Sequence, residues 1–337
     1  MYTKEFLLDE INAIREEIGH DKVNIFIEEI YFKDNELWII TEDRPDKSAV
    51  IGKGGWVVGK LKEKLGLDSI HVESYGDFLN KEYKLRLSKK TVSNINMDSI
   101  GLRNLKKTIE NKLDNIYSFN FDTYFKQHSF EESDKNEAVV ALSGGVDSSF
   151  SLILAKKLGL NPIAVTVDPG TIILPKQFKE NIKLLTESLE IHHEYIEADY
   201  SEVIQESFTG KVHPCGRCSN NTGELVKQYA KDKEIPIIVF GDMLATGSQC
   251  INLQEDSLYR LNLPASLSVG KQEIKSLIRN YDLNEFKGFG CPLLYEVHKK
   301  FPYMKKFSIQ RILRETRSGA LEPGEALDLI WSFYKTK

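Results

Sequence analysis

The stretch "EAVVALSGGVDSSFSLILAKKLG", residues 137–159, decides the fold of the second half of this chain. Its apolar run at 138–142 is typical of a buried strand, and the apolar residues at 150–158 are typical of a helix that ends at a glycine. Between them lies the turn "SGGVDSS", residues 143–149. A strand that leads through glycines into a helix N-terminus offers backbone N–H groups to an anion, so this turn predicts a phosphate-binding loop.

The residues of this turn are expected to contribute to anion binding in different ways. Gly144 and Gly145 let the backbone approach a phosphate closely. Three hydroxyls can donate hydrogen bonds, those of Ser143, Ser148 and Ser149. Asp147 would repel a bare phosphate, so we expect it beside Mg²⁺ or in ordering the loop. The simpler explanation is a glycine-rich turn in which Ser and Asp cap a helix.

Apolar strands and amphipathic helices continue to alternate after this turn. Strands are predicted at 162–168, 192–199 and 235–242, and helices at 177–190 and 224–234. Strict alternation builds a parallel sheet with helices on both faces. The predicted fold class is α/β with a doubly wound parallel sheet, preceded by a small α+β module and followed by about 60 mainly helical residues.

The string "SGGVDSS" resembles the PP-loop of the N-type ATP pyrophosphatases, and it lacks the lysine of a Walker A loop. The resemblance covers roughly residues 135–270, with "VFGDMLATGSQ", residues 239–249, in the place of a second family stretch. It implies that ATP and Mg²⁺ bind, that a substrate oxygen is adenylated with release of pyrophosphate, and that a nucleophile displaces AMP. The implied nucleotide site comprises Ser143, Gly144, Gly145, Val146, Asp147, Ser148, Ser149, Asp168, Gly241 and Asp242, with Asp147 catalytic.

All four cysteines lie in the second half of the chain, at Cys215, Cys218, Cys250 and Cys291. The first two have the spacing C-x₂-C and Cys291 stands far from them. In a cytosolic chain such clustering indicates metal binding or catalysis rather than disulfides. The residues alone leave open a structural zinc site with Cys250 or His213 as fourth ligand, buried thiols, and a redox-active dithiol. Catalytic or persulfide-carrying thiols without a cluster are a further alternative.

A C-x₂-C pair followed by a distant cysteine, inside a PP-loop domain, resembles the iron–sulfur-dependent tRNA thiolation enzymes. The resemblance implies a [4Fe–4S] cluster, with Zn²⁺ as the alternative, held by the catalytic residues Cys215, Cys218 and Cys291. It also implies tRNA and a sulfide or persulfide donor as partners. We expect Cys250 to be a buried thiol. Val146 stands where this branch often has lysine, so the sulfur donor and the target base stay open.

A second glycine-rich loop lies near the N-terminus in "VIGKGGWVVGKL", residues 50–61. A helix is predicted at 5–18 before it, with strands at 23–32, 37–42 and 69–74. The loop Gly52-Lys53-Gly54-Gly55 resembles the GxxG loop of a type II KH domain. The resemblance implies that this loop clamps the backbone of about four nucleotides. The simpler explanation is a glycine-rich turn before an ordinary helix.

These patterns divide the chain into a KH-like RNA-binding domain at 1–76, a partly helical connecting region at 77–132, and a PP-loop domain with a helical extension at 133–337. In the connecting region, 83–88 favours a strand and 100–119 a helix. A basic stretch at 298–317 predicts further RNA contacts, or else a solvated helix face, through residues that include Lys305, Lys306 and Arg311.

The bulk composition limits the partners of the protein. The 337 residues carry a formal net charge of −5, so RNA contacts must come from local basic patches. No apolar run approaches the roughly 20 residues of a membrane span, and the N-terminal segment lacks the apolar block of a signal peptide. A cytoplasmic protein without a membrane partner is therefore expected. The oligomeric state stays open, with a homodimer as one candidate.

Together the motifs predict an ATP-dependent RNA sulfurtransferase, of the tRNA 2-thiouridine, 4-thiouridine or 2-thiocytidine type. The phosphate loop would activate a base oxygen, the cysteine site would deliver sulfur, and the N-terminal module would bind RNA. One alternative is a PP-loop sulfurtransferase for a small molecule or cofactor, or an amidating relative. Another is an RNA-binding sensor of iron or oxygen without enzymatic turnover.

Overall fold

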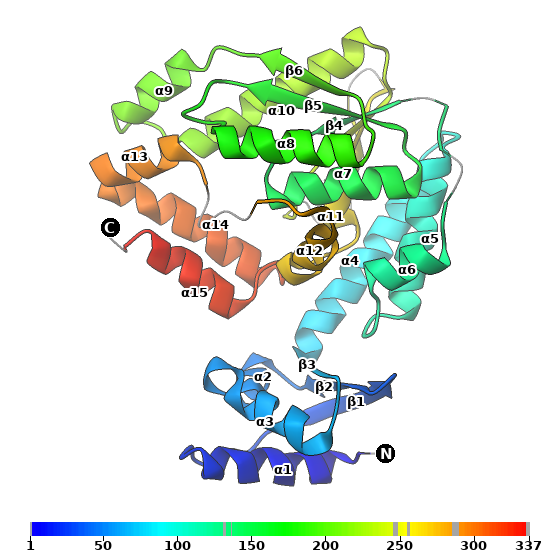
Figure 1. Cartoon of the computed structure of the whole chain (residues 1–337), viewed down its shortest axis with the longest axis vertical. Coiled ribbons are helices and arrows are strands. Elements are labelled where there is room, and N and C mark those ends of the chain that lie inside the picture. Colours follow the sequence, from blue (N-terminus) through cyan, green and yellow to red (C-terminus); the bar gives the residue numbers. More distant parts are fainter. Residues whose placement is uncertain are drawn as a thin grey trace. The chain divides into compact units, whose positions relative to one another are not determined.

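The computed structural model of the protein describes residues 2–130, 133–135, 137–244, 249–254, 257–284 and 290–334. The chain forms two compact units (Figure 1). The first comprises Met1–Tyr83 with Asn115–Ser118, and the second comprises Lys84–Asp114 with Phe119–Lys337. Within the described ranges, no helix combines the length and the apolar character needed to cross a membrane.

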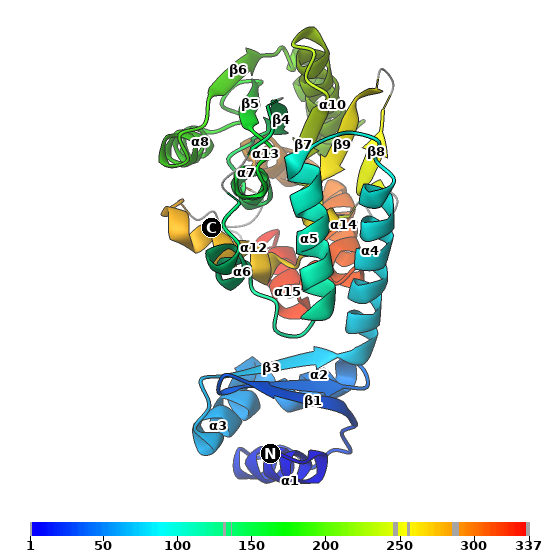
Figure 2. The ribbon, with the colours of Figure 1, turned by 90° about the vertical axis from the view of Figure 1, so that its right-hand side faces the viewer.

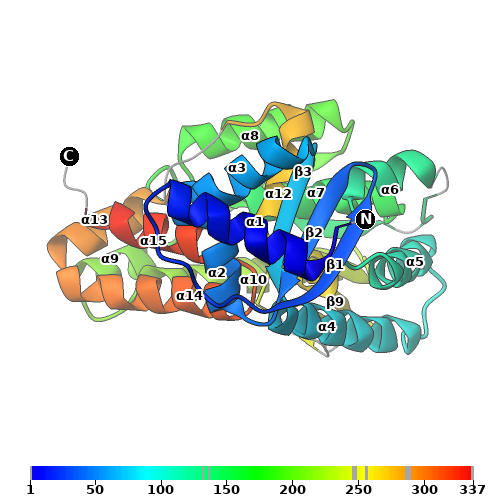
Figure 3. The same cartoon turned by 90° about the horizontal axis from the view of Figure 1, so that it is seen from below.

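The first unit is a three-stranded sheet with helices on one face (Figures 2 and 3). Its elements in chain order are α1 (Lys4–Glu17), β1 (Ile27–Lys33), β2 (Glu36–Thr41), α2 (Arg44–Ile51), the 3₁₀ turn η1 (Lys53–Gly55), α3 (Trp56–Leu65) and β3 (Ser69–Ser74). β1 and β2 are antiparallel, while β2 and β3 are parallel. Asp34 and Asn35 turn the hairpin between β1 and β2 with positive φ angles of 50° and 60°.

Strand β2 buries apolar side chains on both of its faces, and this burial stabilises the first unit. Leu37 and Ile39 are fully buried in the core beneath α1, α2 and α3. Trp38 and Ile40 point to the opposite face and pack against Phe78. The predicted helix at 5–18 and the three predicted strands are all present. Helix α2 was not predicted, although Asp43 with Pro45 two residues later is a helix-start signal. The Asp43 side chain does cap this helix, because it accepts a hydrogen bond from the Asp46 amide.

The second unit is built on a six-stranded sheet in the order β6-β5-β4-β7-β9-β8. The strands are β4 (Ala138–Ala141), β5 (Pro162–Asp168), β6 (His193–Glu197), β7 (Ile237–Phe240), β8 (Ile251–Leu253) and β9 (Tyr259–Asn262). All neighbours are parallel except β8, which pairs antiparallel with β9 at one edge. The predicted α/β class with a mostly parallel sheet is confirmed. β8 and β9 were not predicted.

Helices cover both faces of this sheet (Figure 2). On one face lie α7 (Val146–Leu158) and α8 (Lys176–Ser188), and on the other lie α9 (Ser201–Phe208) and α10 (Pro214–Asp232). Neighbouring residues of β4 serve the two cores, since Val140 packs toward α7 and Val139 toward α10. The strand order reverses between β4 and β7, so the loops that follow these strands meet at a crevice typical of ligand sites.

The remaining helices surround the sheet of the second unit or connect to it. They are α4 (Tyr75–Ser93), α5 (Ile100–Asp114), α6 (Phe121–Gln127), α11 (Leu263–Ser266), α12 (Lys271–Ile278), α13 (Pro292–Lys300), α14 (Lys305–Arg317) and α15 (Pro323–Ser332). The strand predicted at 83–88 is wrong, because these residues lie within α4. The local alternation of apolar and basic residues resembles the pattern of a strand, but the buried residues Leu85, Ser88 and Val92 have helical spacing.

Candidate functional site

The predicted phosphate loop connects β4 to α7. Gly144 has a φ of +73°, and a Cβ there would lie 2.4 Å from the carbonyl oxygen of Phe178, so only glycine fits. Gly145 is the N-cap of α7 and makes no side-chain capping hydrogen bond. Val146 begins the helix and is 37% exposed. The first N–H groups of α7 therefore receive no side-chain cap and can serve an anion.

The serines of this loop differ in their hydrogen bonding. The Ser148 hydroxyl accepts from the Ser143 amide at 3.2 Å, lies 3.0 Å from the Ser143 hydroxyl, and donates to the Gly145 carbonyl at 3.0 Å. The Ser149 hydroxyl is buried and has no hydrogen-bond partner among the described residues. An unsatisfied buried hydroxyl costs about 1–3 kcal/mol. A phosphate oxygen held in the loop is a ligand that would offset this cost.

Asp147 is held by a lysine from a distant helix. The ammonium nitrogen of Lys271, the first residue of α12, lies 2.5 Å from a carboxylate oxygen of Asp147. Their side chains are 15% and 26% exposed. The loop after β7 also approaches here, because a Cβ on Gly241 would lie 2.8 Å from the carbonyl carbon of Asp147. No sequence motif marks Lys271, so its part in this site was not predicted.

The two other predicted nucleotide residues end neighbouring strands and form ion pairs. Asp168, at the end of β5, accepts from the Gly170 amide at 3.0 Å and pairs with Lys179. Asp242 follows β7 and pairs with Arg260 at 2.7 Å. The phosphate loop, Asp168 and Gly241 thus all lie at the carboxyl-terminal ends of parallel strands of the sheet. Residues 245–248 of the stretch predicted at 239–249 lie outside the described residues.

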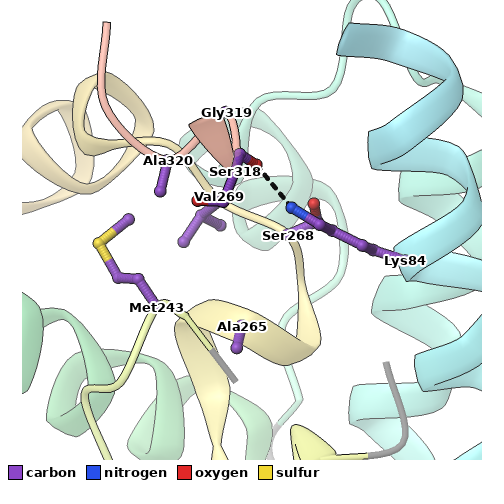
Figure 4. A pocket seen from close by; sticks show the side chains of 8 residues that line it. All are labelled: Lys84, Met243, Ala265, Ser268, Val269, Ser318, Gly319 and Ala320. Carbon is purple, nitrogen blue, oxygen red and sulfur yellow. Dashed lines mark hydrogen bonds between the residues drawn. The ribbon is translucent and has the colours of Figure 1, made fainter. Parts of the chain in front are cut away.

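A small pocket is lined in part by Met243, which lies in the loop after β7 (Figure 4). It is lined by Lys84, Met243, Ala265, Ser268, Val269, Ser318, Gly319 and Ala320. The ammonium group of Lys84 donates to the Ser318 carbonyl at 2.6 Å across it. Its volume of about 10 Å³ holds about one water molecule. This pocket is therefore too small for a nucleotide.

The three predicted ligand cysteines lie at the N-termini of two helices. Cys215 and Cys218 occupy the first turns of α10, and Cys291 is the N-cap of α13. Burial raises the pKa of Cys215 to about 11, while Arg311 lowers it and Cys291 raises it. Burial raises the pKa of Cys218 to about 12, with Cys215 and Cys291 adding to the shift. The three thiols therefore lie within electrostatic range of one another and stay protonated near neutral pH.

The donor set fits a soft metal centre in its chemistry. Three thiolates suit an iron–sulfur cluster with one open iron. The described part of the chain does not, however, bring three His, Cys, Asp or Glu side chains into a ready-made metal group. Loading a cluster would require the thiols to lose their protons. Cys250 lies elsewhere, fully buried, with its sulfur 3.2 Å from the Ser88 hydroxyl.

Arg311 on α14 interacts electrostatically with both parts of this site. Its Nε donates to Glu315 at 3.0 Å, and 48% of its side chain is exposed. The pKa of Arg311 is raised: burial opposes its charge, but Glu315, Cys215 and Asp147 together favour it. The guanidinium thus lies within electrostatic range of both the phosphate loop and the cysteine site. From its place in the basic stretch at 298–317, Arg311 was predicted to contact RNA.

The two other basic residues predicted to bind RNA begin α14. Lys305 lies 4.7 Å from the ring centroid of Tyr334, and Lys306 lies 5.0 Å from that of Phe307. Both are cation–π distances, so the ammonium groups lie over aromatic faces. The structure therefore gives these lysines intramolecular neighbours at the surface of α14.

A hydrogen-bonded bridge that the sequence did not reveal joins the cysteine-bearing helices. The Ser308 hydroxyl on α14 lies 3.1 Å from His213 Nε2 and 3.2 Å from His298 Nε2. His213 caps α10 and His298 belongs to α13. Burial lowers the pKa of His298 to about 4, with His213 and Lys305 adding to the shift. Burial lowers the pKa of His213 as well, so both imidazoles are neutral near pH 7.

The predicted GxxG loop lies in the first unit, between α2 and α3. Gly52, Gly54 and Gly55 all have positive φ angles, of 72°, 64° and 78°. A Cβ on Gly52 would lie 2.3 Å from a Val57 methyl group, so glycine is required there. Lys53 is exposed, and Gly55 caps α3 without a side-chain hydrogen bond. The loop thus presents a lysine and uncapped helix N–H groups to the solvent.

Comparison with known proteins identifies relatives in an archaeon. No family model matches the sequence. The chain is 34% identical over 250 residues to Uncharacterized protein MJ1638 of Methanocaldococcus jannaschii, which covers 74% of this chain and 92% of that protein. It is 25% identical over 203 residues to Uncharacterized protein MJ1599 of the same organism, covering 58% of this chain and 73% of that protein.

Solved structures give weaker likenesses. The U34-tRNA thiolase NcsA from Methanococcus maripaludis, solved with its [4Fe-4S] cluster, has a TM-score of 0.38 at 12% identity, covering 69% of this chain and 78% of that one. NMN synthetase from Francisella tularensis has a TM-score of 0.37 at 17% identity, covering 70% and 94%. The fold is therefore established by the strand order and register described above, not by these likenesses. By its identity and coverage, the chain belongs to the same protein family as MJ1638 of Methanocaldococcus jannaschii.

Proposed function

We propose that this protein is an ATP-dependent RNA sulfurtransferase whose substrate is a tRNA base. The observation that carries the proposal is the position of Arg311, within electrostatic range of Asp147 in the phosphate loop and of the Cys215 thiol. An enzyme that replaces oxygen by sulfur needs the activating nucleotide and the sulfur-handling group at one reacting carbon. A cation whose charge interacts with both a phosphate loop and a set of thiols suits that requirement.

The phosphate loop supports an adenylation step. The carbonyl oxygen of the base would attack the α-phosphorus of ATP, and the bond from that phosphorus to pyrophosphate would break. The N–H groups of α7 and the cations Lys271 and Arg311 would stabilise the negative charge of the leaving pyrophosphate. Asp147 would then share its charge between Lys271 and a Mg²⁺ ion bound with the nucleotide.

The cysteines support the second step. Hydrosulfide from the donor would attack the adenylated carbon and lose its proton, the bond from carbon to the AMP oxygen would break, and a C=S group would remain. A [4Fe–4S] cluster held by Cys215, Cys218 and Cys291 would supply an iron with an open position for hydrosulfide. Zinc, or thiols that carry persulfide, are the alternatives for the same three residues.

The first unit supports RNA as the substrate. Apart from the unpredicted helix α2, its elements follow the order of helix, two strands, glycine loop, helix and strand on which the resemblance to a type II KH domain rests. Backbone N–H groups and Lys53 at this loop suit the phosphates of a single strand. A small substrate would have no use for such a loop. We propose that the cytoplasm is where the enzyme acts.

The test measures pyrophosphate and the modified base. Purified protein, loaded with iron and sulfide without oxygen, should release AMP and pyrophosphate from ATP when tRNA is added, and nucleoside mass spectrometry should detect a thiolated base. Release of ADP and phosphate would contradict adenylation. Pyrophosphate release that is equal with and without tRNA would favour a small substrate. No release under any condition would favour an RNA-binding sensor.

A further inference from the structure

The glycine loop of the first unit is followed at once by an exposed tryptophan. Trp56 begins α3 directly after Gly55, and 66% of it is exposed. For comparison, Trp38 in β2 is 6% exposed and Trp331 in α15 is 53% exposed. An indole offers more apolar surface than any other side chain, so its exposure leaves a large area for a ligand to cover.

The indole of Trp56 lies beside the loop and has no aromatic partner. A Cβ added to Gly54 would lie 3.6 Å from Trp56 Cδ1, so the ring borders the bare glycine backbone. Among the described residues, neither an aromatic ring nor a cation contacts the Trp56 ring. The faces of the ring are therefore available to a planar group that approaches from the loop.

The charges around Trp56 favour a negatively charged ligand. Four basic residues of the first unit are paired with acids, in the pairs Arg44–Asp77, Lys47–Glu73, Lys60–Glu17 and Lys64–Glu10. Lys53, in the loop itself, is exposed and has no acidic partner in the described part of the chain. The first turn of α3 holds no acid, and its N-terminus adds positive potential. An unpaired lysine and an uncovered indole thus stand within four residues of each other.

We propose that Trp56 is a stacking platform for an unpaired RNA base whose phosphate is held at Lys53 and the glycine loop. Stacking on an aromatic side chain needs a base with a free face, so a single strand is bound and a continuous duplex is not. Every base has a π face, so this contact selects unpaired nucleotides with little regard to sequence. The proposal rests on the RNA substrate of the proposed function and adds Trp56 as the side chain that contacts a base.

The experiment uses the full chain and a fluorescein-labelled single-stranded RNA of ten adenosines. In Trp331→Phe protein, Trp56 is the exposed tryptophan that remains and Trp38 is buried, so quenching of indole emission by the RNA reports on Trp56. Fluorescence anisotropy should show that Trp56→Ala weakens binding about 5- to 150-fold, the equivalent of about 1–3 kcal/mol of stacking. Trp56→Phe should lose less, because it keeps a ring. The matched control Trp331→Ala should bind as the wild type does.

The outcomes separate this inference from the proposed function. In one outcome the wild type and Trp56→Ala bind the RNA equally well, and the indole emission of Trp331→Phe protein does not change. This result would contradict stacking on Trp56 and would leave the proposed RNA substrate unaffected. If the wild type binds no RNA even at low salt, the RNA substrate of the proposed function is wrong and the platform falls with it. If Trp56→Ala converts a dimer into a monomer in sedimentation without affecting RNA binding, Trp56 serves self-association instead. Quenching together with weakened binding supports the proposal.

Discussion

The ammonium nitrogen of Lys271 lies 2.5 Å from a carboxylate oxygen of Asp147, although the two residues are 124 positions apart in the chain. This ion pair ties the N-terminus of α12 to the first turn of α7. Both side chains are mostly buried, so removing one partner leaves a poorly solvated charge on the other. The pair therefore contributes both to the local fold and to the charge balance at the phosphate loop.

The first prediction concerns this ion pair. Lys271→Met should lower the free energy of unfolding by on the order of 1–3 kcal/mol, and adding Asp147→Asn should restore part of that loss because both charges are then gone. Pyrophosphate release should fall about 10²- to 10³-fold in Lys271→Met, if the lysine stabilises the leaving group. Asp147→Ala should abolish release while tRNA binding persists. Chemical denaturation and a pyrophosphate assay measure the two effects.

A lysine one turn along the same helix provides the control. Lys275 pairs with Glu325 at 2.5 Å and is 47% exposed, so Lys275→Met should change stability little and activity not at all. Equal activity losses in Lys271→Met and Lys275→Met would mean that α12 is disturbed as a whole. In that case Lys271 has no special part in phosphate chemistry.

Two neighbouring serines give the second prediction. Ser148→Ala loses the hydrogen bonds to Ser143 and Gly145, so it should destabilise the protein by on the order of 1–2 kcal/mol. Ser149→Ala removes a buried hydroxyl without a described partner, so stability should be unchanged or slightly higher. The Michaelis constant for ATP should nevertheless rise in Ser149→Ala if that hydroxyl donates to a phosphate. A clear stability loss in Ser149→Ala would show that its hydroxyl is bonded in the apoprotein.

Features that depend on residues close together in the chain could be predicted from the sequence, and features that depend on distant residues could not. The strands and helices at 137–190 are specified by local periodicity, and glycines at 144 and 145 are needed wherever a backbone approaches an anion. The pair of Asp147 with Lys271, and the bridge from His213 through Ser308 to His298, join segments far apart in the chain. No local pattern encodes such contacts, so they emerge only once the sheet is assembled. In α4, burial at helical spacing overrode a local strand-like alternation.

The third prediction concerns the metal. Protein purified without oxygen should hold about four irons per chain, and replacing Cys215, Cys218 or Cys291 by Ala should remove them. Cys250→Ala is the matched control, since this thiol is buried beside Ser88, and it should keep the iron. The visible absorbance and an iron assay measure the outcome. Stoichiometric zinc and no iron would exclude the cluster and leave the other uses of the three thiols.

The fourth prediction is a pH dependence of stability that arises at the histidine bridge. Burial lowers the pKa of His298 to about 4, below the ordinary value of 6.5, so between these values the unfolded chain binds more protons than the folded protein. The contribution of neutral His298 to the free energy of unfolding is therefore fully present above about pH 6.5 and is lost as the pH falls toward 4. The loss at pH 4 should be on the order of 2–3 kcal/mol. Denaturation of the apoprotein at several pH values measures it.

Carboxylates also titrate in that pH range, so the comparison must be with a variant. His298→Gln keeps a hydrogen-bonding group for Ser308 but does not titrate. Its stability should fall less steeply than that of the wild type between pH 6.5 and pH 4. Identical slopes for the two proteins would mean that His298 titrates normally in the folded state.

The last prediction separates recruitment of RNA from chemistry. Replacing Lys53 and Gly54 by Asp places two negative charges, and one added side chain, where phosphates are expected to approach. Binding of tRNA should weaken, and its salt dependence should flatten, because a complex with fewer phosphate contacts releases fewer counterions when it forms. Thiolation should fall steeply at low tRNA concentration and recover at saturating tRNA, while iron content and ATP binding stay unchanged. Filter binding over a range of salt concentrations, with thiolation rates at several tRNA concentrations, measures these effects.

The opposite end of the same helix offers a control of equal charge. Lys62 is exposed, and Gly66 caps α3 with a φ of +65° and no atom within 4 Å of an added Cβ. Lys62→Asp with Gly66→Asp therefore makes the same change in charge and a similar backbone strain, about ten residues of helix away from the loop. If the loop clamps RNA, the Lys53 and Gly54 variant loses far more affinity than this control. If both variants weaken binding equally, the effect is one of net charge, and the glycine loop is not the RNA clamp.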